Sequence, residues 1–165
     1  MSACVFAGSF DPPTRGHESV ISRCVARYGK VFVVIGENKD KECLFTPQER
    51  KKMLETLFQD TPSVIVVNYA DYKQDYAKFL LDNQITTYVR GIRNQTDFEY
   101  EKGQEEFNKI KYPFITTEYM HADEEFVGFS SSLVKKKIES GEDFSELVPE
   151  SVLEEINLIL KERKA

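Results

Sequence analysis

The chain has 165 residues and a formal net charge of −6, and 41% of its residues are hydrophobic. A chain of this length is expected to fold as one domain that buries roughly 70% of its unfolded surface, so no metal or disulfide staple is needed. The acidic balance and the absence of tryptophan argue against a nucleic-acid surface, which would have to neutralise many phosphates. Any phosphate ligand should therefore be small and locally contacted.

The cysteine pattern and the hydropathy concern the cellular context. Cys4, Cys24 and Cys43 form no CxxC pair and no zinc set with a nearby histidine, so we expect reduced, partly buried thiols. No apolar stretch approaches the roughly 20 residues that span a bilayer, and Met1 leads straight into a predicted strand without a targeting segment. We therefore expect a soluble cytoplasmic protein with no membrane partner.

The first two predicted elements enclose an unusual turn. The apolar run Cys4 to Ala7 predicts a strand, and apolar residues recur at helical spacing from Val20 to Tyr28. Between them, Gly8 to His17 reads GSFDPPTRGH, which predicts a tight turn and a helix that opens at Gly16-His17. The unpaired N–H groups and the positive dipole end of that helix would face the turn, an arrangement that holds phosphate. Since His17 stands at the opening, the pattern indicates a chemical site.

The remaining elements alternate regularly. Thr46-Pro47-Gln48-Glu49 is a capping box with proline at the first helical position, and it predicts the start of the second helix. In chain order we expect a strand at 31–35, a helix from Thr46, a strand at 64–67, a helix at 76–81, a strand at 86–89 that stops at Arg90-Gly91, a helix at 97–110, a strand at 114–120, a helix from Ser131 that ends at Gly141, and an amphipathic helix from about Pro149. This alternation predicts an α/β fold in which a doubly wound, five-stranded parallel sheet is flanked by helices, as a single domain over 1–165.

Ligands of open parallel sheets bind outside the carboxyl ends of the strands, where the strand order reverses. Four segments should reach that edge: Gly8 to Asp11, the loop with Lys39 and Lys41, Arg90 to Arg93, and Gly128 to Ser132. They would bring together two arginines, a lysine, a histidine, two glycine turns and a serine-rich helix start, although the chain as a whole is acidic. We expect these segments to form one site.

GSFDPPTRGH resembles the (S/T)FDP…TxGH signature of the pantetheine-phosphate adenylyltransferases, which belong to the wider HxGH nucleotidyltransferase superfamily. Thr14 stands at the first histidine of the HxGH turn, as in the pantetheine enzymes. Three further segments resemble that family's other motifs in order and spacing: LFTPQER at 44–50, VRGIRNQTDFEYE at 89–101 and FSSSLVKK at 129–136. The resemblance covers roughly the whole chain and implies a Rossmann-like fold.

The resemblance implies transfer of the adenylyl group of ATP to 4'-phosphopantetheine, giving dephospho-coenzyme A and pyrophosphate without a covalent enzyme intermediate. A phosphate nucleophile needs no general base at neutral pH, so alignment and neutralisation of anions would carry the mechanism. Mg²⁺ is expected to ride on the ATP phosphates, because no dedicated carboxylate cage is visible. The resemblance also suggests a homohexamer, with exposed apolar residues such as Phe107 or Tyr112 supporting an interface, and feedback by coenzyme A in the active site.

The same resemblance assigns roles to individual residues. The catalytic groups would be His17, which donates to the α-phosphate, Lys41, and Arg93, which contacts the leaving phosphates. Phosphopantetheine would contact Ser9, Lys41, Tyr76 and Arg90, and Ser9 would bridge the two substrates. The ATP site would comprise Ser9, Phe10, His17, Gly91, Ile92, Arg93, Glu101, Phe126, Val127, Gly128, Phe129, Ser130, Ser131 and Ser132.

Each assignment has a structural alternative. His17 could make only a helix-start hydrogen bond, Lys41 could belong to a solvated charge run, and Tyr76 could be ordinary helix packing. Two other activities also fit the superfamily: transfer to another acceptor, as in nicotinamide-mononucleotide adenylyltransferase or glycerol-phosphate cytidylyltransferase, and nucleotide sensing without catalysis. Thr14 and the sequence RGIR favour the pantetheine enzyme over other acceptors. A sensor would be expected to have lost His17 or Lys41, and both are present.

Overall fold

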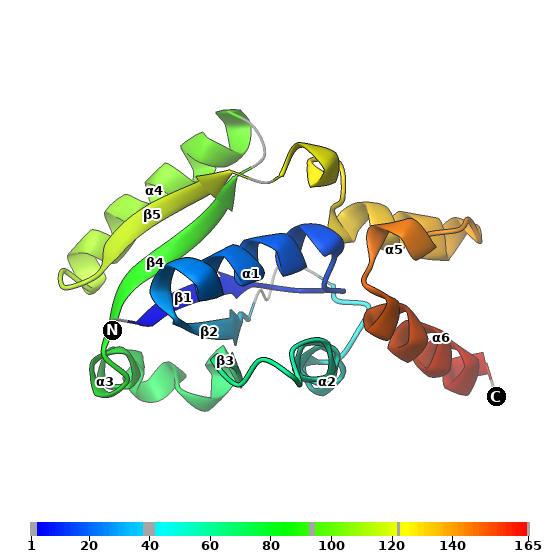
Figure 1. Cartoon of the computed structure of the whole chain (residues 1–165), viewed down its shortest axis with the longest axis horizontal. Coiled ribbons are helices and arrows are strands. Elements are labelled where there is room, and N and C mark those ends of the chain that lie inside the picture. Colours follow the sequence, from blue (N-terminus) through cyan, green and yellow to red (C-terminus); the bar gives the residue numbers. More distant parts are fainter. Residues whose placement is uncertain (1–2, 38–41, 93–94, 122, 165) are drawn as a thin grey trace.

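The computed structural model describes residues 3–37, 42–92, 95–121 and 123–164, without the side chains of residues 95–98, 101, 104 and 107. One parallel sheet has the strand order β3-β2-β1-β4-β5, with helices on both faces (Figure 1). The expected fold class is confirmed. The elements are β1 (Ala3–Gly8), α1 (Arg15–Tyr28), β2 (Lys30–Ile35), α2 (Pro47–Leu57), β3 (Val64–Asn68), η1 (Tyr69–Asp71), η2 (Lys73–Asp75), α3 (Tyr76–Asp82), β4 (Ile85–Ile92), α4 (Gln95–Lys111), β5 (Thr116–His121), η3 (Glu124–Phe126), α5 (Ser131–Ser140), η4 (Ser145–Leu147) and α6 (Glu150–Lys164).

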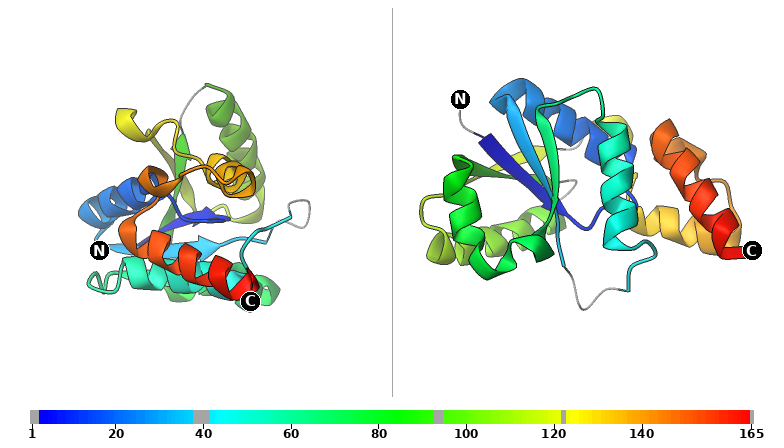
Figure 2. Two further views of the ribbon diagram at one scale, coloured as in Figure 1. Left: turned by 90° about the vertical axis from the view of Figure 1, so that its right-hand side faces the viewer. Right: turned by 90° about the horizontal axis from the view of Figure 1, so that it is seen from below.

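The sheet is buried on both faces because its side chains alternate between two apolar clusters. Along β1, Cys4 and Phe6 pack with residues of α1 and α2, whereas Ala3 and Val5 pack with residues of α3 and with the segment that follows α4. Figure 2 shows the helices on the two sides of the sheet from two further directions. The near-continuous apolar runs of the central strands follow from this two-sided burial.

A third apolar cluster lies beyond the sheet and joins α5 and α6 to α2. The expected stripe of α6 is confirmed, since Val152, Ile156 and Ile159 are buried in this cluster together with Phe45. In Figure 1 both helices lie at the end of the molecule to which the strand arrows point. The C-terminal part of the chain thus packs next to the carboxyl ends of the strands.

Three local predictions are confirmed and one is wrong. Thr46 caps α2 with a full capping box, Pro47 is its first residue, and Gly141 ends α5 in the left-handed conformation at φ 73°. The fourth strand, however, continues to Ile92, because β4 pairs with β5 through the last of the register pairs, Ile92 with His121. The expected strand end and glycine turn at Arg90-Gly91 are therefore replaced by regular strand.

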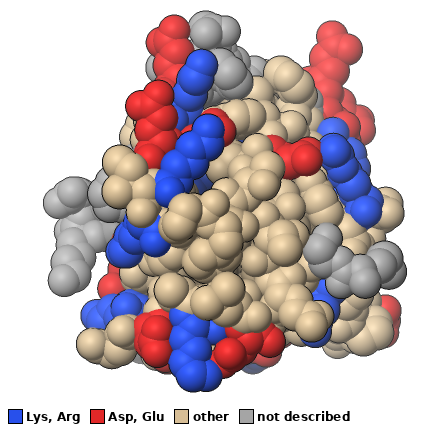
Figure 3. All heavy atoms as spheres, turned by 90° about the vertical axis from the view of Figure 1, so that its left-hand side faces the viewer, with Lys and Arg blue, Asp and Glu red and all other residues tan. Residues whose placement is uncertain are grey.

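The end of the molecule that lies away from α5 and α6 carries its charged side chains mainly around the rim, and the middle of this face is uncharged (Figure 3). The α4–β5 connection lies at this end, and the nearby Ile110 and Phe114 are exposed by 86% and 38%. Tyr112, which was expected to be exposed, is buried in the cluster beneath α3. Within the described residues, no helix is long and apolar enough to cross a membrane.

Candidate active site

The two central strands separate at their carboxyl ends. β1 and β4 pair only as far as Phe6 and Val89, although β1 continues beside β2 to Gly8 and β4 continues beside β5 to Ile92. This is the point where the strand order reverses, and a hollow of about 290 Å³ opens there. It is lined by Phe6, Ala7, Ser9, Phe10, Asp11, Thr14, Gly16, His17, Val20, Cys43, Arg90, Gly91, Phe126, Phe129, Ser130, Ser131, Ser132 and Lys135.

The structure brings most of the expected site residues to this hollow. Those among its lining residues are Ser9, Phe10, His17, Arg90, Gly91, Phe126, Phe129, Ser130, Ser131 and Ser132. Ile92 follows Gly91 on β4 but is buried, and Val127 and Gly128 are exposed residues that do not line the hollow. Lys41 and Arg93 lie outside the described residues. Glu101 belongs to α4, and its side chain lies outside them too.

His17 both starts α1 and lines the hollow. The backbone N–H of Thr14 donates to Nδ1 of His17 over 3.0 Å, and the Thr14 hydroxyl accepts from the His17 backbone N–H over 3.4 Å. These two contacts form a capping box in which His17 takes the place that glutamate or glutamine usually holds. Because Nδ1 accepts a hydrogen bond, the neutral ring carries its proton on Nε2, which is therefore a donor. The helix-start hydrogen bond expected for His17 is therefore present, and it uses Nδ1 of the ring.

Phe10 shapes the turn between β1 and α1. Its φ of 51° is in the left-handed region, which a bulky residue adopts only when its surroundings impose it. The Phe10 ring is 1% exposed and packs edge-on against His17, with ring centroids 4.9 Å apart. A side chain at Gly8 would crowd this ring, since its Cβ would come within 3.3 Å of it. The turn and the histidine ring are thus held by one aromatic contact.

The start of α5 closes one side of the hollow. Ser130 caps this helix by accepting from the Leu133 N–H over 3.1 Å, and the Ser131 hydroxyl donates to the Pro12 carbonyl over 2.7 Å. The Thr14 hydroxyl donates to the Phe129 carbonyl over 3.2 Å. The N-terminus of a ten-residue helix with its serine cap is therefore fixed against the turn before α1.

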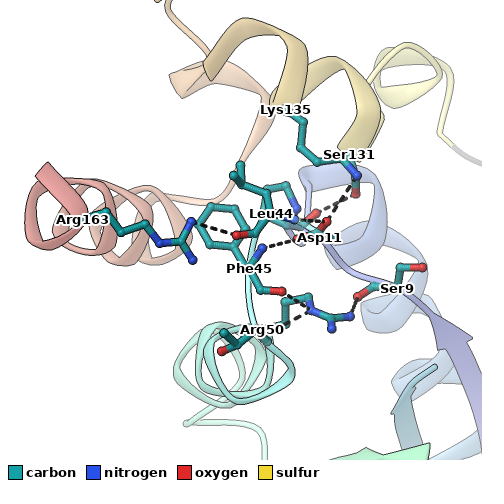
Figure 4. A network of polar contacts seen from close by, with 10 residues as sticks. Ser9, Asp11, Leu44, Phe45, Arg50, Ser131, Lys135 and Arg163 are labelled. Carbon is teal, nitrogen blue, oxygen red and sulfur yellow. Dashed lines mark hydrogen bonds and ion pairs between the residues drawn. The ribbon is translucent and has the colours of Figure 1, made fainter. Parts of the chain in front are cut away.

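Asp11 links three segments that meet beside the hollow (Figure 4). Its carboxylate is 1% exposed and accepts from the Leu44 and Phe45 N–H groups, each over 2.9 Å. The Lys135 ammonium of α5 lies 3.2 Å from the same carboxylate. A buried negative charge would repel a phosphate ligand, so the hydrogen bonds and the ion pair with Lys135 are what make Asp11 compatible with an anion site.

Arg90 has aromatic residues behind it. Its guanidinium lies 5.3 Å from the ring centre of Tyr88, and the Tyr88 hydroxyl donates to the Tyr76 hydroxyl over 2.7 Å. Tyr76 is 7% exposed, is not among the residues that line the hollow, and packs against Tyr112 and Phe79. Burial raises the pKa of Tyr76 to about 12. The structure thus favours the packing reading of Tyr76, which supports Arg90 through Tyr88.

The described groups suit a phosphate-bearing ligand better than a bound metal. Arg90 and the N-terminal ends of α1 and α5 face the hollow, and the His17 ring supplies a donor. Asp11 is the one carboxylate among the described lining residues, and both its oxygens already accept hydrogen bonds. No group of three or more metal-binding side chains occurs in the described part of the chain.

No catalytic or binding role was predicted from the sequence for Asp11, Arg50 or Lys135. Arg50 is 4% exposed and donates through Nη1 to the Ser9 carbonyl over 2.8 Å, directly behind the turn. All three residues stand inside conspicuous sequence motifs, FDPP, TPQER and SSSLVKK. That position was the available signal, but the contacts that connect these residues to the turn and to one another span 33 to 124 residues of the chain, which no local pattern reveals.

Comparison with known proteins agrees with this geometry. A family model described as cytidylyltransferase-like matches residues 5–137. A phosphopantetheine adenylyltransferase of Levilactobacillus brevis is 39% identical over 152 residues, which are 92% of each chain. One of Thermotoga neapolitana is 37% identical over 160 residues, 97% of this chain and 98% of the relative. One of Flavobacterium psychrophilum is also 37% identical, over 92% of this chain and 98% of the relative. The chain therefore belongs to the cytidylyltransferase-like family and, within it, to the phosphopantetheine adenylyltransferases.

Proposed function

We propose that this enzyme transfers the adenylyl group of ATP to 4'-phosphopantetheine, with dephospho-coenzyme A and pyrophosphate as products. The observation that carries the proposal is the hollow between β1 and β4, where the His17 ring, Arg90 and two helix N-termini converge. The names of the relatives supply the acceptor.

The reaction is a single displacement at the α-phosphorus of ATP. A phosphate oxygen of 4'-phosphopantetheine forms the new bond to that phosphorus, and the bond from it to the bridging oxygen of the β-phosphate breaks. The electron pair leaves with pyrophosphate, and no enzyme group becomes covalently bound. Both reactants are anions, so the protein has to align them and offset their repulsion.

His17 donates its Nε2–H to an α-phosphate oxygen as charge accumulates there. Ser9 bridges the two substrates, Lys41 and Arg90 hold the acceptor phosphate, and Arg93 contacts the leaving pyrophosphate. Arginine suits such a role because its planar donors contact several oxygens at once.

The nucleotide is held along the edge of the hollow. The backbone of Gly91 and Ile92 faces it where β4 has moved away from β1, and Glu101 contributes from α4. Phe126 to Ser132 cover the nucleotide, with the serines at the start of α5 on its phosphates. The nucleotide substrate is the magnesium complex of ATP, which brings its metal with it.

The same proposal extends to assembly and control. We expect a cytoplasmic homohexamer that coenzyme A inhibits by occupying the active site, since coenzyme A contains the parts of both substrates. Sedimentation velocity measures the assembly, and a monomer at all concentrations would contradict it. Inhibition by coenzyme A should be relieved by raising either substrate; inhibition that persists at saturating amounts of both would place its site elsewhere.

The substrate is tested by pyrophosphate release with ATP and magnesium. The assay compares 4'-phosphopantetheine with nicotinamide mononucleotide and glycerol phosphate. Release with phosphopantetheine alone, together with dephospho-coenzyme A, is the expected result. Release with another acceptor would move the enzyme to a sister activity, and ATP binding without release would indicate a nucleotide sensor.

A further inference from the structure

We propose that Arg50 is a positioning residue for the transfer, because it fixes Ser9 in the hollow from behind. The proposal rests on the proposed function, in which the Ser9 hydroxyl contacts both substrates. Arg50 lies in α2 and is not among the residues that line the hollow. It therefore acts through Ser9 and not on the substrates.

Different nitrogen atoms of the Arg50 guanidinium bind two separate segments of the chain. Its Nη1 donates to the Ser9 carbonyl over 2.8 Å, and its Nε donates to the Phe45 carbonyl over 3.0 Å and to the Thr46 carbonyl over 3.3 Å. The side chain is 4% exposed, so water does not compete strongly for these acceptors. A single ammonium could not reproduce the span, because lysine carries its donors on one nitrogen.

The segment Phe45-Thr46, whose carbonyls accept from Arg50, is also bound through the Phe45 N–H. The Phe45 N–H donates to Asp11, whose carboxylate is fixed further by Leu44 and Lys135. The peptide groups before and after Phe45 are thus bound to two residues of the same turn, Asp11 directly and Ser9 through Arg50. Figure 4 shows this closed set of contacts, with the Ser9 carbonyl directed at Arg50 and the Ser9 side chain directed away from it.

The backbone of Arg50 lies in the well-fixed first turn of α2. It follows the capping box of α2, in which Thr46 and Glu49 satisfy each other's backbone N–H groups over 2.8 and 3.1 Å. Arg163 of α6 further holds this segment by donating to the Leu44 carbonyl and to Glu49, each over 2.8 Å. Ser9 is the first residue after the end of β1, so the fixed guanidinium determines where its carbonyl, and with it the hydroxyl, is placed.

The test is a double-mutant cycle of Arg50→Lys and Ser9→Ala in the full-length enzyme, with kcat and thermal unfolding measured for each variant. Arg50→Lys keeps the charge but loses the span, and Ser9→Ala removes the hydroxyl but keeps the carbonyl that Arg50 binds. We expect each variant to lower kcat by about tenfold or more, the range for a hydrogen bond to a charged group. The kcat of the double variant should be within about twofold of the kcat of the less active single variant. The losses in melting temperature, in contrast, should add.

Lys51→Met is the matched control. Lys51 is the next cation on α2 and has no hydrogen bond or ion pair within the described part of the chain, so its kcat should equal that of the wild type. A purely structural role of Arg50 would give losses in kcat that multiply in the double variant, or full activity in Arg50→Lys. Either result would overturn the proposal.

The proposed function is decided separately by the wild type. If the wild type uses another phosphate acceptor, the proposed function fails and the cycle is measured with that acceptor. If the wild type releases no pyrophosphate with any acceptor, the cycle is measured as ATP affinity by calorimetry. Coupled losses then support the placement of Ser9 by Arg50, and independent losses refute it.

Discussion

His17 serves the fold as a helix cap and, in the proposed reaction, also serves the site. Its Nδ1 accepts from the Thr14 N–H at the start of α1, and this contact determines which nitrogen carries the proton. The aromatic contact with Phe10 fixes the plane of the ring beside the hollow. The cap and the aromatic contact thus fix the ring in advance, which is what the proposed role of His17 as a preorganised donor requires.

The two roles of His17 can be separated by substitution. Glutamine keeps a capping-box acceptor at the third helical position, whereas alanine does not. We expect His17→Gln to unfold at close to the wild-type temperature and His17→Ala to lose about 1 kcal/mol of stability. Both should bind ATP and lose at least about a hundredfold in turnover.

Calorimetric ATP binding, thermal unfolding and steady-state turnover of the two variants check this prediction. Near-normal turnover in His17→Gln would mean that the ring is only a cap.

The helices and strands differ in how far the sequence determines them. The start of α2 was predicted correctly because the capping box involves only Thr46 and Glu49, which are neighbours in the chain. The end of β4 was missed because its last residues are held in the strand by β5, about 30 residues later. Arg50 was missed for the same reason, since its hydrogen bond to Ser9 spans 41 residues. Local signals thus predict the elements, and contacts between distant segments decide their ends and their supports.

The cap of α2 provides a test at this scale. Thr46→Ala removes the side-chain acceptor of the Glu49 N–H, and we expect it to lower the free energy of unfolding by about 1 kcal/mol. Thr46→Ser keeps the hydroxyl and should stay close to the wild type. Urea unfolding of the two variants measures the difference, and equal stability would show that the capping box is dispensable.

The packing of α3 on β4 makes the fold sensitive to alkali. Burial raises the pKa of Tyr76 to about 12 and also raises the pKa of Tyr88, whose hydroxyl donates to it. The unfolded chain releases these protons near pH 10, before the folded protein does. The stability that depends on these two neutral phenols is therefore fully present below about pH 10, and it is lost as the pH rises from about 10 toward 12.

The double variant Tyr76→Phe/Tyr88→Phe should weaken this decline, because it removes the two buried phenols. Tyr100→Phe is the control, since the Tyr100 ring is 67% exposed and should leave the decline unchanged. Urea unfolding at pH 8 to 11 measures how the free energy of unfolding of each protein declines with pH. A decline of equal slope in all three proteins would contradict the assignment to the buried pair.

At the scale of the whole molecule, the strand order places the site. β1 lies between β2 and β4, and the divergence of β1 from β4 creates the hollow at the carboxyl edge of the sheet. The sequence predicted this edge and most of the residues that line it, because local patterns along the chain indicate the turn, the order of the strands and the serine-rich helix start. It did not predict the arrangement of α2, α5 and α6 around the turn, since that arrangement depends on a separate apolar cluster.

The central claim is the direct transfer of an adenylyl group to 4'-phosphopantetheine in this hollow, and the fate of the α-phosphate of ATP tests it most directly. The enzyme is mixed with magnesium, 4'-phosphopantetheine and ATP that carries radioactive phosphorus at the α position. The account predicts that the label moves into dephospho-coenzyme A in the same amount as pyrophosphate is released, with none bound to the protein. Label on the protein, or in free AMP alone, would contradict it.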